Sequence, residues 1–147
     1  MSTQLPQRPT GAFIGASWLA LLVGAATYVI GQWNAGNMAL NEKGYYIVLL
    51  MYGLFSAVSL QKSVRDRMEG MKVTNIYYGL CWISVLFSIL GLTIGLWNAA
   101  LQPTEKGFYA MAFVLSLLAA VAVQKNVRDI ALADDGIARS PVDMSKE

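Results

Sequence analysis

The sequence predicts an all-α membrane protein with four transmembrane helices, arranged as two tandem helical hairpins that are parallel repeats of each other. Three observations lead to this prediction. Hydrophobic residues make up 56% of the 147 residues and charged residues only 14%, against roughly 25% charged in typical soluble domains. The charges are clustered, which leaves four long uncharged runs. The second half of the chain also repeats the motifs of the first half.

The four uncharged runs have the length and character of membrane spans. The first and third contain 19 and 22 residues, and a helix needs about 20 to cross a hydrocarbon core ~30 Å thick. The second and fourth contain only 16 residues each, although Lys62 can extend the second span by snorkelling. No run has the charged face of a soluble amphipathic helix. The runs are residues 12–30, 45–60, 76–97 and 108–123.

The runs divide the chain into two hairpins, residues 12–66 and 76–129, and three polar segments. Residues 1–11 form the N-terminal segment and residues 67–75 the linker between the hairpins. We expect the tail, residues 130–147, to be disordered because it is polar and contains glycine and proline. The first span resembles a signal peptide loosely, but it is the repeat partner of an internal span, so we expect it to be retained.

Three motifs occur once in each half of the chain and define the repeat. Gly-x-Trp-Asn-Ala begins at positions 31 and 95, Glu-Lys-Gly-aromatic-Tyr at 42 and 105, and Gln-Lys-x-Val-Arg-Asp at 61 and 124. Twelve of the 25 positions from Glu42 to Asp66 are identical to their partners. Because each copy holds two spans, both copies enter the membrane from the same side. A pseudo-two-fold axis along the membrane normal should therefore relate them.

Lysine and arginine are distributed unevenly between the two sides of the predicted membrane. Of the 11 such residues, nine lie in the N-terminal segment, around the linker or in the C-terminal region, and the two hairpin tips carry only Lys43 and Lys106. Cytoplasmic loops are enriched in these residues. We therefore expect a multi-pass protein with its N-terminus and C-terminus in the cytoplasm.

The tandem motifs resemble those of the YiaA/YiaB family of inner membrane proteins, whose defining unit is a two-helix domain with a characteristic linking section. The resemblance extends over residues 13–129, and the presence of two copies resembles the YiaA branch of the family. This resemblance implies a location in the bacterial inner membrane. It implies no particular activity.

The residue inventory excludes several classes of function. The chain has no histidine and a single cysteine, so it cannot form the usual zinc sites or a Ser/His or Cys/His nucleophilic pair. A net charge of +2 without a basic stripe argues against nucleic acid binding. No span carries the buried charge that coupled transporters and proton relays need. We expect no cofactor, no metal site and no enzymatic activity, and the lipid bilayer as the main environment.

The hairpin tips contain a candidate outer-face interaction motif. Trp and Tyr favour membrane interfaces, Asn41 and Thr104 are good N-caps, and a glutamate in the first helical turn suits the helix dipole. The glycine after each lysine would allow close backbone approach. These structural roles explain most of the pattern and leave open a paired polar site, or an ion pair between Glu of one tip and Lys of the other. The motif consists of Trp33, Asn34, Glu42, Lys43, Gly44, Tyr46, Trp97, Asn98, Glu105, Lys106, Gly107 and Tyr109.

The ends of the second and fourth spans carry a candidate cytoplasmic anchor. Cations at a helix C-terminus suit both the helix dipole and an anionic leaflet, and Lys62 lies four residues before Asp66, where an ion pair can form. The two aspartates fit an anchor least well, which leaves a partner surface open. The anchor consists of Gln61, Lys62, Arg65, Asp66, Gln124, Lys125, Arg128 and Asp129.

Small residues recur at every fourth position in the spans, as at Gly91 and Gly95, and predict close helix packing. Cys81 is the repeat partner of Ser17, so we expect a packing role for it. These features favour a non-enzymatic interaction or oligomeric structural component, acting as a homo-oligomer or with a membrane protein partner. The alternative is a small passive channel or transporter formed by an oligomer and lined by hydroxyls, for which the candidates are Ser17, Thr27, Ser56, Ser84 and Ser88.

Overall fold

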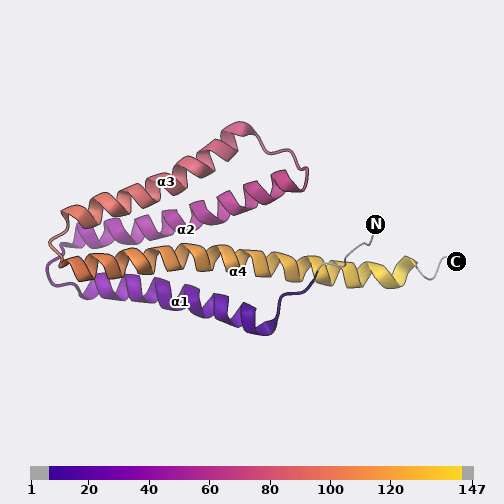
Figure 1. Ribbon diagram of the computed structural model, residues 1–147, viewed down its shortest axis with the longest axis horizontal. Helices are drawn as coiled ribbons and strands as arrows, with labels where there is room; N and C mark the ends of the chain where they lie inside the picture. Colours follow the sequence, from indigo (N-terminus) through magenta and orange to yellow (C-terminus); the bar gives the residue numbers. More distant parts are fainter. Residues whose placement is uncertain (1–6, 144–147) are drawn as a thin grey trace.

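The computed structural model describes residues 7–143 and forms four helices over that range (Figure 1). All four are long and apolar enough to cross a membrane, which confirms the predicted fold class. The α1–α2 and α3–α4 turns lie at one end of the bundle, called the tip end below. The opposite end holds the α2–α3 loop, the start of α1 and the long extension of α4. The helices are α1 Gly11–Asn34, α2 Leu40–Met68, α3 Asn75–Asn98 and α4 Pro103–Asp143.

The first helices of the two repeats begin and end alike. The hydroxyls of Thr10 and Thr74 each accept a hydrogen bond of 3.3 Å from the backbone N–H three residues later, which caps α1 and α3. Both helices end at the asparagine of the Trp-Asn pair, Asn34 and Asn98. Between α2 and α3 the chain turns at Gly70, whose φ of 77° suits glycine.

The helices pack across the repeats and not within them. The first helix of each repeat lies along the second helix of the other, so α1 packs on α4 and α3 packs on α2 (Figure 1). The second helices, α2 and α4, meet in the middle of the bundle. Consecutive helices α1 and α2, like α3 and α4, touch only lightly. The predicted hairpins are therefore continuous in sequence, but the two repeats are interlocked in space.

The core of the bundle depends on close approach between these partners. Tyr28 of α1 and Phe113 of α4 are fully buried, with ring centroids 5.7 Å apart. A Cβ built on Gly24 of α1 would lie 2.8 Å from Ser116 Oγ and 3.3 Å from the carbonyl oxygen of Ala112, both on α4. Small residues at this crossing thus permit the helix contact, as predicted from the stripe in the sequence.

Helix α4 continues beyond the membrane span to Asp143. The prediction of a disordered tail is therefore wrong for residues 130–143, and residues 144–147 lie outside the described part of the chain. Leucine and alanine are good helix formers, and Ala133 is buried. Asp134 also lies 3.9 Å from the guanidinium of Arg8. Packing and composition together extend the helix.

Candidate functional site

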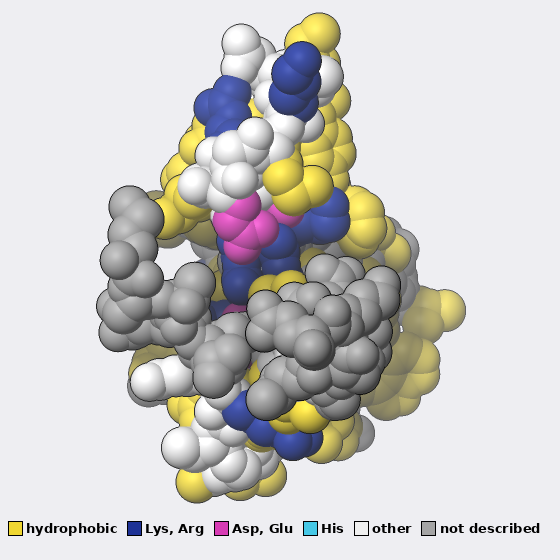
Figure 2. Space-filling view, turned by 90° about the vertical axis from the view of Figure 1, so that its right-hand side faces the viewer, with side chains coloured by type: hydrophobic (Ala, Val, Ile, Leu, Met, Phe, Trp, Pro, Cys, Tyr) yellow, Lys and Arg dark blue, Asp and Glu magenta, His cyan; other side chains and the backbone are white. Residues whose placement is uncertain are grey.

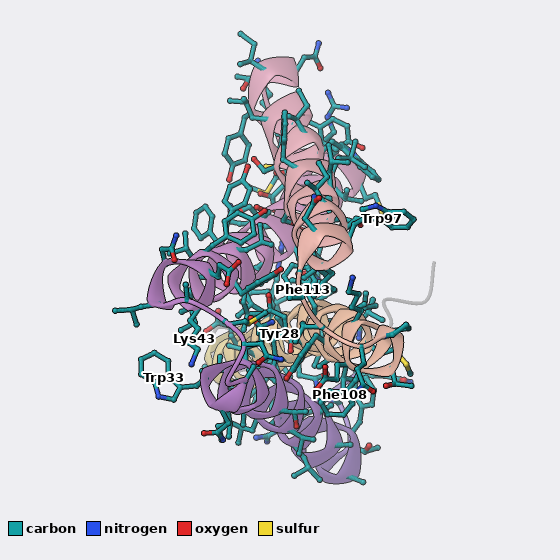
Figure 3. All side chains as sticks on the ribbon, turned by 90° about the vertical axis from the view of Figure 1, so that its left-hand side faces the viewer. Tyr28, Trp33, Lys43, Trp97, Phe108 and Phe113 are labelled. Carbon is teal, nitrogen blue, oxygen red and sulfur yellow. The ribbon has the colours of Figure 1, made fainter. Side chains whose placement is uncertain are left out.

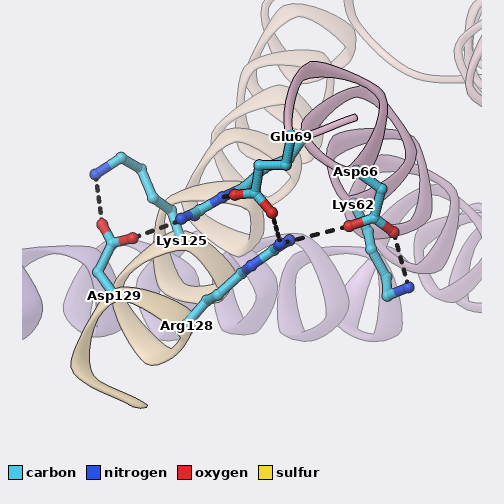
Figure 4. Close-up of polar contacts among 7 residues, drawn as sticks. Lys62, Asp66, Glu69, Lys125, Arg128 and Asp129 are labelled. Carbon is cyan, nitrogen blue, oxygen red and sulfur yellow. Dashed lines mark hydrogen bonds and ion pairs between the residues drawn. The ribbon is translucent and has the colours of Figure 1, made fainter. Parts of the chain in front are cut away.

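Charged side chains from α2, from its C-cap residue Glu69 and from α4 gather at the end of the bundle opposite the tips. The space-filling view of this end shows acidic and basic groups side by side (Figure 2). Most of their contacts are drawn in the close-up (Figure 4). We call this group the charged cluster, and its members are Lys62, Arg65, Asp66, Glu69, Lys125, Arg128 and Asp129.

Two ion pairs of the charged cluster connect the repeats reciprocally. Arg65 Nη1 on α2 lies 3.1 Å from Asp129 Oδ1 on α4. Arg128 Nη2 on α4 lies 3.4 Å from Asp66 Oδ1 on α2. In each pair the arginine and the aspartate occupy adjacent positions of the same motif in opposite repeats. The pseudo-two-fold relation expected from the sequence is thus present in the contacts.

Each aspartate also holds a lysine from its own helix. Lys62 Nζ lies 3.1 Å from Asp66 Oδ2, and Lys125 Nζ lies 2.9 Å from Asp129 Oδ2. The first of these confirms the predicted four-residue pairing. The aspartate side chains are only 11% and 18% exposed, so their ion pairs are screened less than ordinary surface pairs. These contacts give both aspartates a role as partners of arginine and lysine, which a membrane anchor alone would not require.

Glu69 makes the charged cluster asymmetric. Its two carboxylate oxygens accept from Arg65 Nε at 2.9 Å and from Arg128 Nη2 at 2.8 Å. The repeat partner of Glu69 is Leu132, which cannot bridge. Glu69 follows the motif and lies in the linker, so the repeat pattern does not single it out. Its position four residues after Arg65 was the signal that could have identified it.

A groove of about 880 Å³ lies between α2, α3 and α4. Its wall is apolar and includes Trp82, Val85, Leu117, Leu118 and Val121. Its mouth lies at the charged cluster and includes Gln61, Arg65, Glu69, Lys125 and Asp129. The groove could not be predicted from the sequence, because its three helices become neighbours only through packing across the repeats. Gln124 is the one predicted anchor residue that belongs neither to the charged cluster nor to the mouth of the groove. It is half-buried on α4.

At the tip end, the motif glutamates and lysines form hydrogen bonds with backbone groups of their own repeat. Glu42 Oε2 accepts from the backbone N–H of Ala39 at 2.8 Å, and Glu105 makes the same contact at the start of α4. The predicted N-caps, Asn41 and Thr104, are wrong because both lie inside the first helical turn.

Each tip lysine binds the end of the preceding helix. Lys43 Nζ donates to the carbonyl of Trp33 at 2.6 Å, and Lys106 Nζ donates to that of Trp97 at 3.1 Å. Within the part of the chain that the structure describes, no ion pair joins the two tips. The predicted Glu–Lys pairing between hairpins is therefore wrong, since both groups already have partners nearby.

The motif tyrosines pack inside the bundle, although an exposed interfacial position was expected for them. Tyr46 and Tyr109 are only 3% and 6% exposed. A Cβ on Gly31 would lie 2.7 Å from Tyr109 Cε1, and one on Gly95 would lie 3.1 Å from Tyr46 Cε1 and 2.9 Å from Cε1 of the neighbouring Tyr45. We call these two contacts, which join opposite repeats, the tyrosine–glycine contacts.

The prediction of close backbone approach at Gly44 and Gly107 is wrong. A Cβ built at either position meets no atom within 4 Å. Close approach occurs instead at the glycines of the Gly-x-Trp-Asn-Ala motif, which the tyrosines cover. The recurrence of glycine and tyrosine in both copies was the available signal.

The two motif tryptophans remain exposed at the tip end. Trp33 and Trp97 are 55% and 81% exposed and extend away from the bundle (Figure 3). Lys43 Nζ lies 5.8 Å from the ring centroid of Trp33. The neighbouring Asn34 and Asn98 are exposed at the helix ends, where Asn98 Nδ2 donates to the carbonyl of Ile94 at 2.9 Å. This placement suits the interfacial role expected for tryptophan.

Polar side chains inside the bundle bond mainly to protein groups. Ser17 accepts from Asn126 Nδ2 at 3.1 Å, and at the repeat-related position Cys81 Sγ lies 3.5 Å from Ser63 Oγ. Cys81 is buried with a free thiol, as a packing residue would be. The candidate pore hydroxyls of Ser17, Ser56 and Ser88 donate to carbonyls of their own helices.

Comparison with known proteins identifies relatives over most of the chain. The model of the yiaA/B two-helix domain matches residues 13–66 and 77–129, once for each repeat. The inner membrane protein YiaA of Escherichia coli (strain K12) is 57% identical over 118 residues, which cover 80% of this chain and 81% of that protein.

Two further relatives are more distant. The inner membrane protein YiaB of Escherichia coli (strain K12) is 29% identical over 67% of this chain and 83% of its own length. The uncharacterized membrane protein YubF of Bacillus subtilis (strain 168) is 36% identical over 46% of this chain and 77% of its own length. No solved structure matches the chain significantly.

Proposed function

The chain belongs to the yiaA/B two-helix-domain family, and from this premise we propose that this multi-pass inner membrane protein is a non-enzymatic interaction or structural component. The observation that supports this function is that the polar groups of the repeated motifs bind other parts of the same bundle. The charged cluster joins α2 to α4. The tip glutamates and lysines hold helix ends. These groups support a rigid body and leave no constellation suited to acid–base chemistry.

We place the charged cluster and both termini on the cytoplasmic side. The distribution of 11 Lys and Arg residues supports this orientation, since only Lys43 and Lys106 belong to the tip end. A reporter protein that is active only in the cytoplasm, fused after Glu147, should be active. The same reporter inserted in the α3–α4 turn should be inactive, and the reverse pattern would invert the proposed orientation.

The alternative, an oligomeric passive channel, has weaker support. Three of the five hydroxyls that could line a pore, those of Ser17, Ser56 and Ser88, are buried in the bundle and donate to backbone carbonyls of their own helices. Purified protein in liposomes should therefore raise ion or solute flux no more than empty liposomes do. Flux above that background would contradict the proposal and favour the channel.

Photo-crosslinking in cells tests the interaction role. A crosslinker replaces Trp97, which is 81% exposed at the tip end, and a control replaces Leu90, which is 52% exposed on the same helix. Capture of one distinct membrane protein only from position 97 would identify an accessory partner. Capture of a second copy would identify a homo-oligomer. Identical products at both positions, or none at position 97, would contradict an interaction through this end.

A further inference from the structure

We propose that the groove between α2, α3 and α4 binds one anionic phospholipid from the leaflet on the side of the charged cluster. The lipid phosphate would bind at Arg65 and Lys125, and an acyl chain would lie along the apolar wall. This proposal goes beyond the interaction role above, because it assigns a small lipid ligand to a site distinct from the tip end. It rests on the shape of the wall, on free donors at the mouth and on the asymmetry between repeats.

The apolar wall matches the depth of one leaflet. Along α4 the groove extends from Val114 to Asp129, and its part from Val114 to Lys125, where the headgroup would bind, is about 17 Å long at ~1.5 Å per residue. Half of a hydrocarbon core is ~15 Å thick. A chain whose headgroup lies at Lys125 would therefore reach about the middle of the membrane along this wall. Trp82 and Val85 of α3 form the opposite side.

The mouth of the groove has hydrogen-bond donors that the charged cluster does not use. Each carboxylate oxygen of Glu69 and Asp129 already accepts from an arginine or lysine. Lys125 has three donor hydrogens and directs one contact to Asp129, while its side chain remains 54% exposed. Arg65 uses Nε and Nη1 in the charged cluster, which leaves Nη2. A phosphate oxygen is the group that such donors bind most strongly.

The charges at the mouth of the groove are balanced, with Arg65 and Lys125 beside Glu69 and Asp129. Both carboxylates already pair with cations, whereas Arg65 and Lys125 keep donors that the charged cluster does not use. A lipid whose headgroup carries no cation can bind these donors without placing another cation beside them, so the mouth complements an anionic lipid better than a zwitterionic one. A basic residue near an anionic headgroup contributes enough to raise affinity about fivefold.

The repeat provides a matched control for this site. Lys62 and Lys125 occupy the same motif position and pair with an aspartate four residues later at 3.1 and 2.9 Å. Their side chains are 60% and 54% exposed. Only Lys125 lines the groove. Replacing either lysine removes the same kind of ion pair, but only one replacement removes the phosphate ligand.

Lipid titration of the full chain, followed by native mass spectrometry, tests the proposal. Phosphatidylglycerol should bind with one molecule per chain and at least about fivefold more tightly than phosphatidylcholine with the same acyl chains. Lys125→Ala should weaken phosphatidylglycerol binding about tenfold, the loss of one charge-assisted hydrogen bond. Lys62→Ala should change it less than about twofold. Equal affinity for the two lipids, or equal losses in the two variants, would overturn the proposal.

A second pair of variants tests the wall independently of the charges. Val85→Phe should obstruct the groove and abolish binding of both lipids. Leu21→Phe, at the repeat-related position outside the groove, should leave binding unchanged. A thermal unfolding midpoint of Val85→Phe close to that of Leu21→Phe, measured without lipid, shows that folding is intact. Unchanged lipid binding by Val85→Phe would overturn the proposal. Capture of a second copy or another protein, instead of lipid, by a photo-crosslinker at Leu118 would do the same.

Discussion

At the end of the bundle that holds the charged cluster, the repeats are joined by ion pairs, whereas at the tip end they are joined by tyrosine rings packed on glycines. Both sets of contacts follow the same pseudo-two-fold relation. Arg65 meets Asp129 as Arg128 meets Asp66. In the same way, Tyr109 covers Gly31 and Tyr46 covers Gly95.

The difference shows that one repeated architecture is stabilised by two kinds of interaction. The ion pairs are partly exposed and act through charge, so salt and charged ligands can change their strength. The tyrosine–glycine contacts are buried and act through shape, so salt should leave them unchanged. Substitutions at the two ends should therefore differ in their salt dependence as well as in their size.

The largest effect is expected at Arg65, which contacts both Asp129 and Glu69. Arg65→Ala should lower the free energy of unfolding in mixed micelles by about 2–3 kcal/mol, somewhat less than a fully buried pair would lose. Lys72→Ala, an exposed change in the α2–α3 loop, should cost less than about 0.5 kcal/mol. Tryptophan fluorescence during denaturation measures both. The effect of Arg65→Ala should shrink at high salt, and a salt-independent loss would show that the cluster does not act through charge.

The next effect is expected at the tyrosine–glycine contacts. Gly31→Ala places a methyl group 2.7 Å from the ring of Tyr109 and should destabilise the protein by about 1–3 kcal/mol at any salt concentration. Gly107→Ala is the matched control, since its methyl group meets open space. It should be neutral or stabilise helix α4 by up to about 1 kcal/mol. Effects of the same sign and size in both variants would contradict a steric role for Gly31.

A smaller effect is expected at the asymmetric member of the charged cluster. Glu69→Leu gives the first repeat the residue that the second repeat has at position 132. Both arginines keep their aspartate partners, and Glu69 is 42% exposed, so the loss should be about 0.5–1 kcal/mol. The same denaturation assay measures it. A loss as large as that of Arg65→Ala would mean that Glu69, and not the reciprocal pairs, holds the cluster together.

The smallest effect is expected at the tip lysines. Lys106→Ala removes one exposed hydrogen bond to the carbonyl of Trp97 and should change the free energy of unfolding by less than about 0.5 kcal/mol. Its salt dependence should match that of the unmodified protein. A large, salt-sensitive loss of unfolding free energy would indicate an ionic contact between the tips. The two ends of the bundle would then not differ in the kind of interaction that joins the repeats.

The sequence was sufficient to predict the number and approximate position of the helices, because uncharged runs and interrupting motifs are local signals. It also identified the repeat and the pairing of Lys62 with Asp66, which depends only on helical spacing. The extension of α4 to Asp143 was missed because its polar composition outweighed its helix formers.

Packing across the repeats could not be derived from the local pattern. A short turn between α1 and α2 suggests a hairpin, but it does not determine which helix each one buries against. The pairing of Tyr109 with Gly31, the reciprocal contacts of Arg65 and Arg128, and the groove all depend on that choice. A tyrosine or aspartate that recurs in both copies therefore had no evident partner within its own repeat.

The interlocked packing of the repeats is tested most directly by engineered disulfide crosslinking in membranes. In a Cys81→Ser background, Ser17→Cys combined with Asn126→Cys pairs α1 with α4 at a hydrogen-bonded contact of 3.1 Å. Ser17→Cys combined with Ser63→Cys, the repeat partner of position 126, pairs α1 with α2 instead. Oxidation and peptide mass spectrometry should detect a disulfide in the first variant and not in the second. A disulfide only in the second would show that each repeat closes on itself and would contradict the interlocked bundle.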